Sequence, residues 1–138
     1  MRIREAVRVI AVRDEDVLLI RHSHDVNWNL PGGGIDEGEA VEETVARELA
    51  EELGVSQEDY ELVHVGLTSQ FRCNPPINGW DGQNNLLVVV SLAKDVEVVV
   101  DGEEVAEHCF GSLDLMVYED LRETAKKTLK QARERDLL

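Results

Sequence analysis

Residues 30–55 read LPGGGIDEGEAVEETVARELAEELGV, and the pattern of the sequence changes within this segment. Three successive glycines predict a backbone that takes unusual dihedral angles or lies close to another group. From residue 39 to residue 53, apolar side chains recur four residues apart, which predicts an amphipathic helix. Gly54 stands where a glycine commonly ends a helix. The segment therefore predicts a glycine-rich loop that leads directly into a helix.

The polar face of this helix carries three carboxylates, Glu48, Glu51 and Glu52, at positions i, i+3 and i+4. At about 3.6 residues per turn these side chains share one patch, where their like charges repel. A divalent cation such as Mg²⁺ or Mn²⁺ would relieve this repulsion, because both ions prefer oxygen ligands. Arg47 precedes Glu51 by one helical turn and can pair with it. A merely solvated acidic face is the alternative that the helix alone leaves open.

Read as one pattern, residues 33–55 follow G-x5-E-x7-R-E-L-x-E-E-x-G-V, which resembles the Nudix hydrolase signature at every specified position. The resemblance implies an α+β Nudix fold, with a mixed β-sheet sandwiched between helices in an α/β/α arrangement. It also implies cleavage of the pyrophosphate bond of a nucleoside diphosphate linked to a group X. The implied cofactor is Mg²⁺, for which Mn²⁺ can substitute.

The resemblance also implies a role for each polar signature residue. Glu48, Glu51 and Glu52 would bind the metal, together with the backbone carbonyl of Gly33. Glu51 and Glu52 are expected to be catalytic, because they would hold the metal or position the attacking water. Arg47 is expected to act with them by holding a carboxylate in place.

The residues around the signature glycine are expected to contact the substrate or to stabilise the loop. Gly32 and Gly34 leave the loop without side chains, so we expect both to lie against the substrate. Glu39 would brace the junction between loop and helix, and its charge also suits the positive end of the helix dipole. Gly54 has a structural role at the other end of the helix.

Two features outside the signature resemble the subgroup of RNA pyrophosphohydrolases and diadenosine tetraphosphate hydrolases. Gly82-Gln83 precedes a strand, as in that subgroup, although Asn85-Leu86-Leu87 departs from its usual continuation. Glu104, six positions before Phe110, takes the place of a late carboxylate that serves as an extra metal ligand or a base. We therefore expect Glu104 to be catalytic. A simple acidic loop is the alternative.

Aromatic residues make up only 4% of the chain, and two of them flank a predicted loop over residues 71–83. Phe71 and Trp80 are candidates for stacking on a nucleobase, with loop packing as the alternative. Arg72 is a candidate for a distal phosphate, and Gln83 is a further candidate for contact with the substrate.

The rest of the chain predicts strands on both sides of the signature helix and a second helix at the end. The strands are expected at residues 6–12 and 17–20, paired as a hairpin, and at residues 61–65, 86–92, 96–100 and 109–110. A loop is expected at residues 101–108, and the final helix at residues 118–135. Strands and helices in this order fit a mixed sheet between two helices.

Composition limits the possible partners. The 138 residues suit one domain over residues 1–138, and the net charge of −15 argues against binding duplex nucleic acid. No apolar run approaches the ~20 residues that span a membrane, so no membrane is expected. Cys73 and Cys109 are expected to be free thiols in a reducing cytoplasm. The oligomeric state is expected to be a monomer or a homodimer.

The favoured hypothesis is a Mg²⁺-dependent hydrolase of small-molecule nucleotides, with nucleoside triphosphates or dinucleoside polyphosphates as substrates. Within the enzyme class, the alternatives are an RNA 5′-pyrophosphohydrolase and a pyrophosphatase of ADP-ribose or nucleotide sugars. Outside it, the alternative is a non-catalytic Nudix module that binds nucleotides. Such modules usually lack a signature glutamate, whereas this chain keeps all of them.

Overall fold

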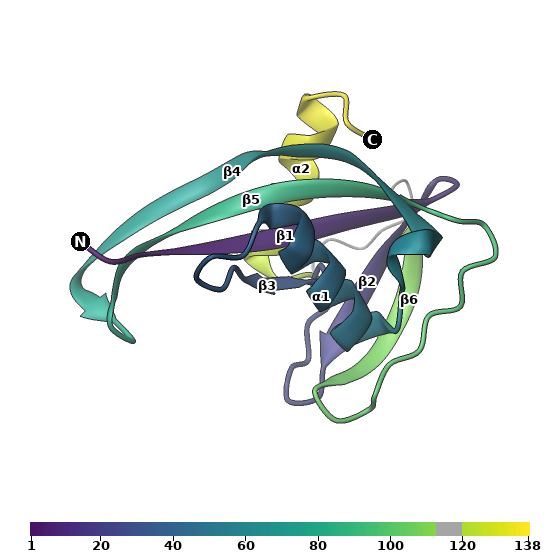
Figure 1. Ribbon diagram of the computed structural model, residues 1–138, viewed down its shortest axis with the longest axis horizontal. Coiled ribbons are helices and arrows are strands. Elements are labelled where there is room, and N and C mark those ends of the chain that lie inside the picture. The colour runs from purple at the N-terminus through teal and green to yellow at the C-terminus, as the bar shows by residue number, and fades with distance from the viewer. Residues whose placement is uncertain (113–119) are drawn as a thin grey trace.

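The computed structural model describes residues 1–112 and 120–138. Its strands form one mixed sheet in the order β4-β5-β1-β2-β6, with the short strand β3 paired to β1 (Figure 1). Only the β1–β5 pair is parallel among the described pairs. The strands are β1 (Ile3–Arg13), β2 (Asp16–His22), β3 (Gly32–Gly34), β4 (Tyr60–Ile77), β5 (Trp80–Leu92) and β6 (Val105–Ser112).

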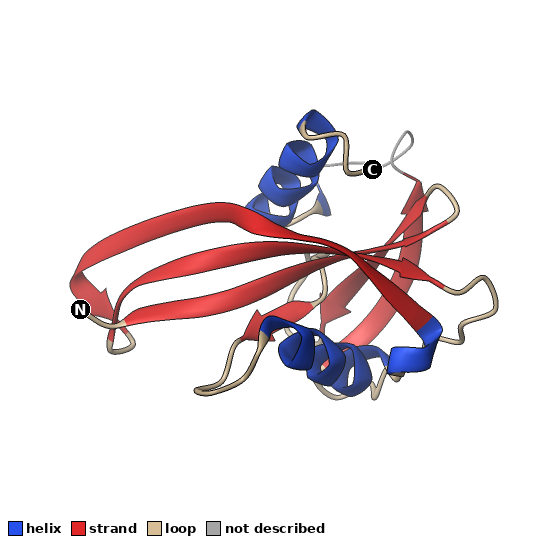
Figure 2. Ribbon diagram, turned by 45° about the horizontal axis from the view of Figure 1, so that its top comes forward, coloured by secondary structure: helices blue, strands red, loops and turns tan. Residues whose placement is uncertain are grey.

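The helices α1 (Val41–Leu53) and α2 (Glu123–Glu134) cover opposite faces of the sheet (Figure 2). The predicted apolar stripe of α1 packs on one face together with Val7 and Val9 of β1. The apolar side of α2 packs on the other face, where it meets Ile10. The expected α/β/α layers and mixed sheet are confirmed. Within the described residues, no helix is long and apolar enough to cross a membrane.

Strand β1 divides its side chains between the two faces, because successive residues of a strand point to opposite sides. Val7, Val9 and Ala11 belong to the core under α1, and Ile10 belongs to the core under α2. By the same alternation, Arg4 and Arg8 lie on the α2 side.

The prediction of a long loop at residues 71–83 is wrong. These residues form the distal half of a hairpin between β4 and β5, which extends away from the helices together with the N-terminal end of β1 (Figure 2). Asn78 and Gly79 make its two-residue turn, with φ angles of 51° and 83°. Asn-Gly at positions of positive φ is a strong hairpin signal. The two prolines in β4 are tolerated because β4 is an edge strand.

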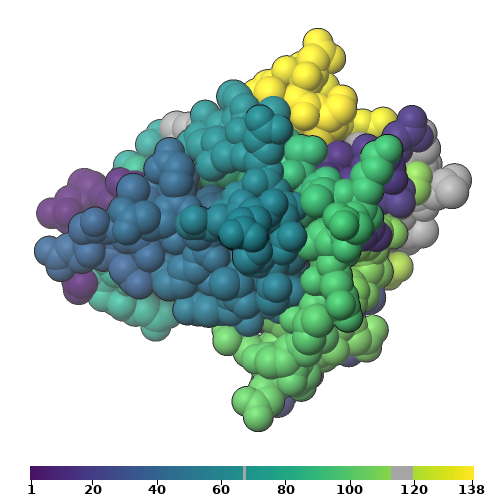
Figure 3. Space-filling view, turned by 45° about the vertical axis from the view of Figure 1, so that its right-hand side comes forward, coloured from purple at the N-terminus to yellow at the C-terminus, as the bar shows by residue number. Residues whose placement is uncertain are grey.

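The prediction of a strand at residues 96–100 is also wrong. This stretch belongs to no strand and crosses the surface beside α1 (Figure 3). Val96, Val98 and Val100 contact the core under α1, while Val99 is exposed and its N–H donates to the carbonyl of Leu53. The alternating valines therefore reflect packing against one helix rather than pairing in the sheet.

The remaining elements differ from prediction mainly in their bounds. The predicted hairpin is confirmed, because Val12 of β1 pairs with Val17 of β2. The strand expected at residues 109–110 begins at Val105, so part of the loop expected at residues 101–108 is strand β6. Helix α2 begins at Glu123, and residues 118–119 of its predicted range lie outside the described residues.

Candidate active site

The glycine strand β3 lies beside α1, and its missing side chains let two carboxylates of the helix approach the loop. The backbone N–H of Gly32 donates to Glu52 Oε1 at 2.9 Å. A Cβ atom on Gly33 would lie 2.3 Å from Glu48 Oε1, so any side chain there would displace this carboxylate. The glycine run therefore brings Glu48 and Glu52 against the backbone of the loop.

Glu48 and Glu52 are buried, with exposed fractions of 9% and 5%. Burial raises the pKa of Glu52 to about 8, although the hydrogen bond from Gly32 opposes the shift. Burial also raises the pKa of Glu48, against the lowering effect of Arg47. Two neighbouring carboxylates that are costly to ionise do not stabilise a fold, and such groups cluster at functional sites.

Arg47 joins the helix to the loop through several carboxylates. Its guanidinium donates to both carboxylate oxygens of Glu39 and to the carbonyl of Gly34, each at 2.9 Å. It also donates to Glu48 Oε1 at 2.9 Å and lies 3.7 Å from Glu51 Oε2. The pairing of Arg47 with Glu51 that the sequence predicted is confirmed.

Glu39 is the centre of the loop–helix junction. Besides Arg47, it accepts hydrogen bonds from Thr44 Oγ1 at 2.6 Å and from the N–H of Asp36 at 3.1 Å. The hydrogen bonds of Arg47 are the main reason why the pKa of Glu39 falls to about 2. Glu39 is therefore ionised at neutral pH and ties the loop to the start of α1.

The expected metal ligands are not drawn together around one point. The Glu51 side chain is 61% exposed and pairs with Arg47. Among residues 1–112 and 120–138, no three His, Cys, Asp or Glu side chains converge as closely as a metal site requires. The donor chemistry nevertheless fits Mg²⁺, because Glu48 and Glu52 offer buried carboxylate oxygens beside the backbone of Gly33.

Glu104 lies just before β6, on an exposed segment. Its charge contributes to the raised pKa values of both Glu48 and Glu52, which places it near them. Its backbone carbonyl accepts a hydrogen bond from Ser23, which holds this segment against the end of β2. Glu107 instead forms an ion pair with Arg21 at 2.5 Å. The structure therefore separates the surroundings of these two neighbouring acidic residues.

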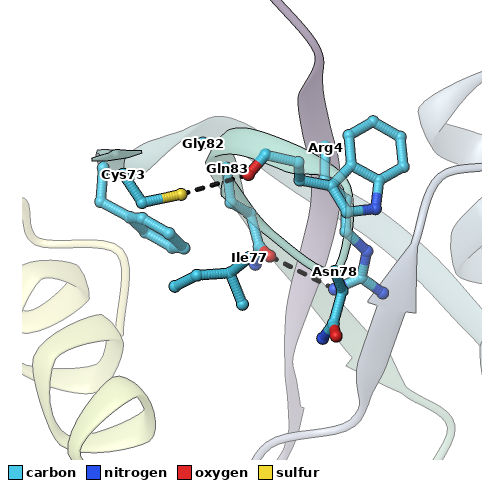
Figure 4. Close-up of a pocket in the computed structure, with 8 residues that line it drawn as sticks. Arg4, Cys73, Ile77, Asn78, Gly82 and Gln83 are labelled. Carbon is cyan, nitrogen blue, oxygen red and sulfur yellow. Dashed lines mark hydrogen bonds between the residues drawn. The ribbon is translucent and has the colours of Figure 1, made fainter. Parts of the chain in front are cut away.

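A pocket of about 350 Å³ lies over β1, β4 and β5 (Figure 4). Three of the predicted substrate residues, Phe71, Trp80 and Gln83, line it. Phe71 is 47% exposed and offers an open aromatic surface, whereas the guanidinium of Arg2 lies 4.6 Å from the centre of the Trp80 ring. Arg4 also lines the pocket and donates to Gln83 Oε1 at 3.3 Å.

The structure does not bring Arg72 into this pocket. Its Nη1 atom donates to the carbonyl of Phe71 and to Asn84 Oδ1. The sequence reasoning missed Arg4 and Arg8, which belong to no motif. The sequence signal was two arginines four residues apart in a strand rich in valine and isoleucine, since this spacing places both on one face.

The model of the NUDIX domain family matches residues 2–132. The RNA pyrophosphohydrolase of Tolumonas auensis is 40% identical over 55 residues, which are 40% of this chain and 32% of that protein. The chain thus matches only about a third of the length of this relative. The nucleoside triphosphatase NudI of Escherichia coli is 28% identical over 107 residues, which are 75% of this chain and 74% of NudI.

The fold has close counterparts among solved structures. The Nudix hydrolase RenU of Mycobacterium smegmatis superposes with a TM-score of 0.77, over 99% of this chain and 86% of RenU, at 19% identity. At this identity the likeness shows the fold alone. The family model covers nearly the whole chain, and two carboxylates of its signature, Glu48 and Glu52, lie at the glycine strand. The chain therefore belongs to the NUDIX domain family.

Proposed function

We propose that this protein hydrolyses the pyrophosphate bond of a small-molecule nucleotide in a reaction that depends on Mg²⁺. The observation that carries the proposal is the pair of buried carboxylates, Glu48 and Glu52, held against the backbone of Gly32 and Gly33. Their burial costs stability in the metal-free protein, and a bound cation would offset that cost.

Glu48 and Glu52, with the carbonyl of Gly33, would hold the metal, and Glu51 would join them or position the water. When bound, Mg²⁺ neutralises phosphate charge and lowers the pKa of a bound water. Arg47 keeps Glu48 and the loop in place through its bonds to Glu39 and Gly34. Glu104 adds negative charge that Glu48 and Glu52 feel, and we assign it the role of accepting a proton from the attacking water or of adding an oxygen ligand.

We propose nucleoside triphosphates or dinucleoside polyphosphates as substrates. The pocket beside Phe71 and Gln83 has room for one nucleobase, and its exposed aromatic ring supports stacking. A net charge of −15 disfavours long RNA, although one relative is an RNA pyrophosphohydrolase. The free thiols of Cys73 and Cys109 support a cytoplasmic location. We also propose that the protein is a monomer or a homodimer and that it binds neither duplex nucleic acid nor a membrane.

The test is a panel of nucleotides incubated with the full chain and Mg²⁺, with each product identified by chromatography. The panel contains nucleoside triphosphates, dinucleoside polyphosphates, ADP-ribose, a nucleotide sugar and a 5′-triphosphorylated RNA. We expect products of pyrophosphate cleavage that disappear in EDTA. Glu52→Gln should lower turnover by about 100-fold, the scale of losing a major electrostatic contribution. Glu42→Gln is the control, because Glu42 is an exposed residue of the same helix outside the signature.

Nucleotide binding without hydrolysis of any compound would instead identify a non-catalytic module. Hydrolysis that persists in EDTA would refute the role of the carboxylates in holding a metal.

A further inference from the structure

Arg8 is a half-buried cation whose side chain has no ion pair or hydrogen bond in the described part of the chain. Its Nε atom is the one buried side-chain nitrogen or oxygen there that lacks a hydrogen bond. No ion pair or hydrogen bond joins the Arg8 side chain to another described residue. A buried N–H donor without a partner costs folding free energy, so packing alone does not explain the position of this side chain.

The surroundings of Arg8 connect it to the catalytic carboxylates. Arg8 pairs in the sheet with Gly32, whose N–H donates to Glu52. The charges of Glu52 and Glu48 both stabilise the Arg8 guanidinium, whereas burial and the neighbouring Arg4 lower its pKa. Arg8 thus lies beside the glycine whose N–H holds Glu52, and neither carboxylate forms an ion pair with it.

Arg4 lies on the same face of β1, with Ala6 between it and Arg8. A Cβ atom on Gly34 would lie 2.8 Å from Arg4 Nη2, so the guanidinium lies against the bare glycine backbone. On its other side, Arg4 Nη1 donates to Gln83 Oε1. Arg4 therefore stands between the glycine strand and the pocket that contains Phe71 (Figure 4).

A chain of hydrogen bonds fixes the polar floor beside Arg4. Gln83 Nε2 donates to Asn85 Oδ1 at 2.7 Å, and Asn85 Nδ2 donates to Ser69 Oγ at 2.9 Å. Asn85 is buried, with an exposed fraction of 6%. This row holds the Gln83 amide in one orientation next to the exposed ring of Phe71, so the floor is ordered before any ligand binds.

From these positions we infer that Arg8 and Arg4 bind successive phosphate groups of the substrate, with Arg8 nearer the glutamates and Arg4 nearer the nucleoside. The nucleobase then lies against Phe71 and the Gln83 amide. Guanidinium groups suit this task because their donors match phosphate oxygens in pairs. The inference rests on the proposed function, which it extends by fixing the direction in which the polyphosphate runs.

The order of the arginines is tested by calorimetric binding of two probes in Mg²⁺: AMP, with one phosphate, and α,β-methylene-ADP, whose bridge resists hydrolysis. Arg8→Gln should weaken binding of the methylene analogue by roughly 10- to 100-fold, the range of a charged hydrogen bond, and change AMP binding far less. Arg4→Gln and Phe71→Ala should weaken binding of both probes. Lys94→Gln removes the same charge from an exposed turn and should change neither.

Stability separates a ligand role from a structural one. Because Arg8 has no partner, Arg8→Gln should melt no lower than the wild type in EDTA. Arg8→Lys keeps the charge but loses the paired donors, so it should bind the analogue with intermediate affinity. Equal losses for both probes in Arg8→Gln, unchanged affinity, or a lower melting temperature without a change in affinity would each overturn the inference.

These results stand apart from the hydrolysis panel. Failure of the wild type to hydrolyse any nucleotide would refute the proposed function, and binding of the two probes would still show where the phosphates lie. Conversely, hydrolysis with no effect of Arg8→Gln on analogue binding would refute the inference alone.

Discussion

Glu52→Gln should make the metal-free protein more stable and the enzyme less active. The substitution removes a buried charge but keeps an oxygen that can accept the hydrogen bond from Gly32. The two effects have one cause, since the same carboxylate is costly to ionise in the empty site and is needed when the cation is bound.

The size of the effect follows from the pKa of Glu52. Burial raises this pKa from 4.5 to about 8 in the folded protein. Between these values the native state binds more protons than the unfolded state, so the free energy of unfolding falls as pH rises through the window. At about 1.36 kcal/mol per pKa unit, the loss above the folded pKa reaches at most about 5 kcal/mol. That is a large part of the stability of a small domain.

The assay is urea unfolding in EDTA at pH 4.5 and at about pH 9, for the wild type, Glu52→Gln and the exposed control Glu42→Gln. At the higher pH, the free energy of unfolding of Glu52→Gln should exceed that of the wild type by roughly 2–5 kcal/mol. At the lower pH, the two free energies should be equal. Because burial also raises the pKa of Glu48, the free energy of unfolding of Glu52→Gln should still fall with rising pH, but less than that of the wild type. Equal stability of Glu52→Gln and the wild type at both pH values would refute the reasoning.

Three further outcomes are expected. A few millimolar MgCl₂ should raise the melting temperature above that in NaCl of equal ionic strength, through binding to the native state, and identical melting curves would contradict a metal site. Glu104→Gln should lower kcat by about 10- to 1000-fold. Glu107→Gln should lose only its ion pair with Arg21 and keep the kcat of the wild type. Equal losses of kcat in Glu104→Gln and Glu107→Gln would contradict a specific role of Glu104. Gly33→Ala should lower turnover by at least about 10-fold while the fold survives, because its Cβ would displace the Glu48 carboxylate. Turnover equal to that of the wild type in a steady-state assay would refute this contact.

The sequence alone predicted the glycine-rich segment and the helix that follows it. The apolar stripe that includes Val45 and Leu49 predicted α1 to within two residues of its start and at its end, because helix periodicity and the glycine cap are local signals. The position of Glu48 and Glu52 on one side of this helix also follows from spacing alone. The raised pKa of Glu52 does not, because burial depends on what packs around it.

The hairpin between β4 and β5 shows why local patterns can mislead. Prolines and glycines near residues 71–83 resemble a loop, yet Asn78-Gly79 turns the chain and lets both strands continue. The valines of residues 96–100 resemble a strand, yet they pack under α1 while the sheet edge is taken by other strands. In both cases pairing between distant segments decided the outcome, because a strand is stable only with a partner.

The sequence by itself determined the patch of acidic side chains on α1, and the tertiary structure decided which other side chains lie near it. Spacing along one helix was enough to predict the carboxylate patch, because residues three and four apart on a helix are neighbours. No local rule brings Glu104 to that patch, or aligns Arg8 of β1 with Gly32 of β3. Nor does any local rule set Arg4 against Gln83 across the parallel β1–β5 pair. These contacts join residues far apart in the chain, so they exist only once the sheet has formed and its register is fixed.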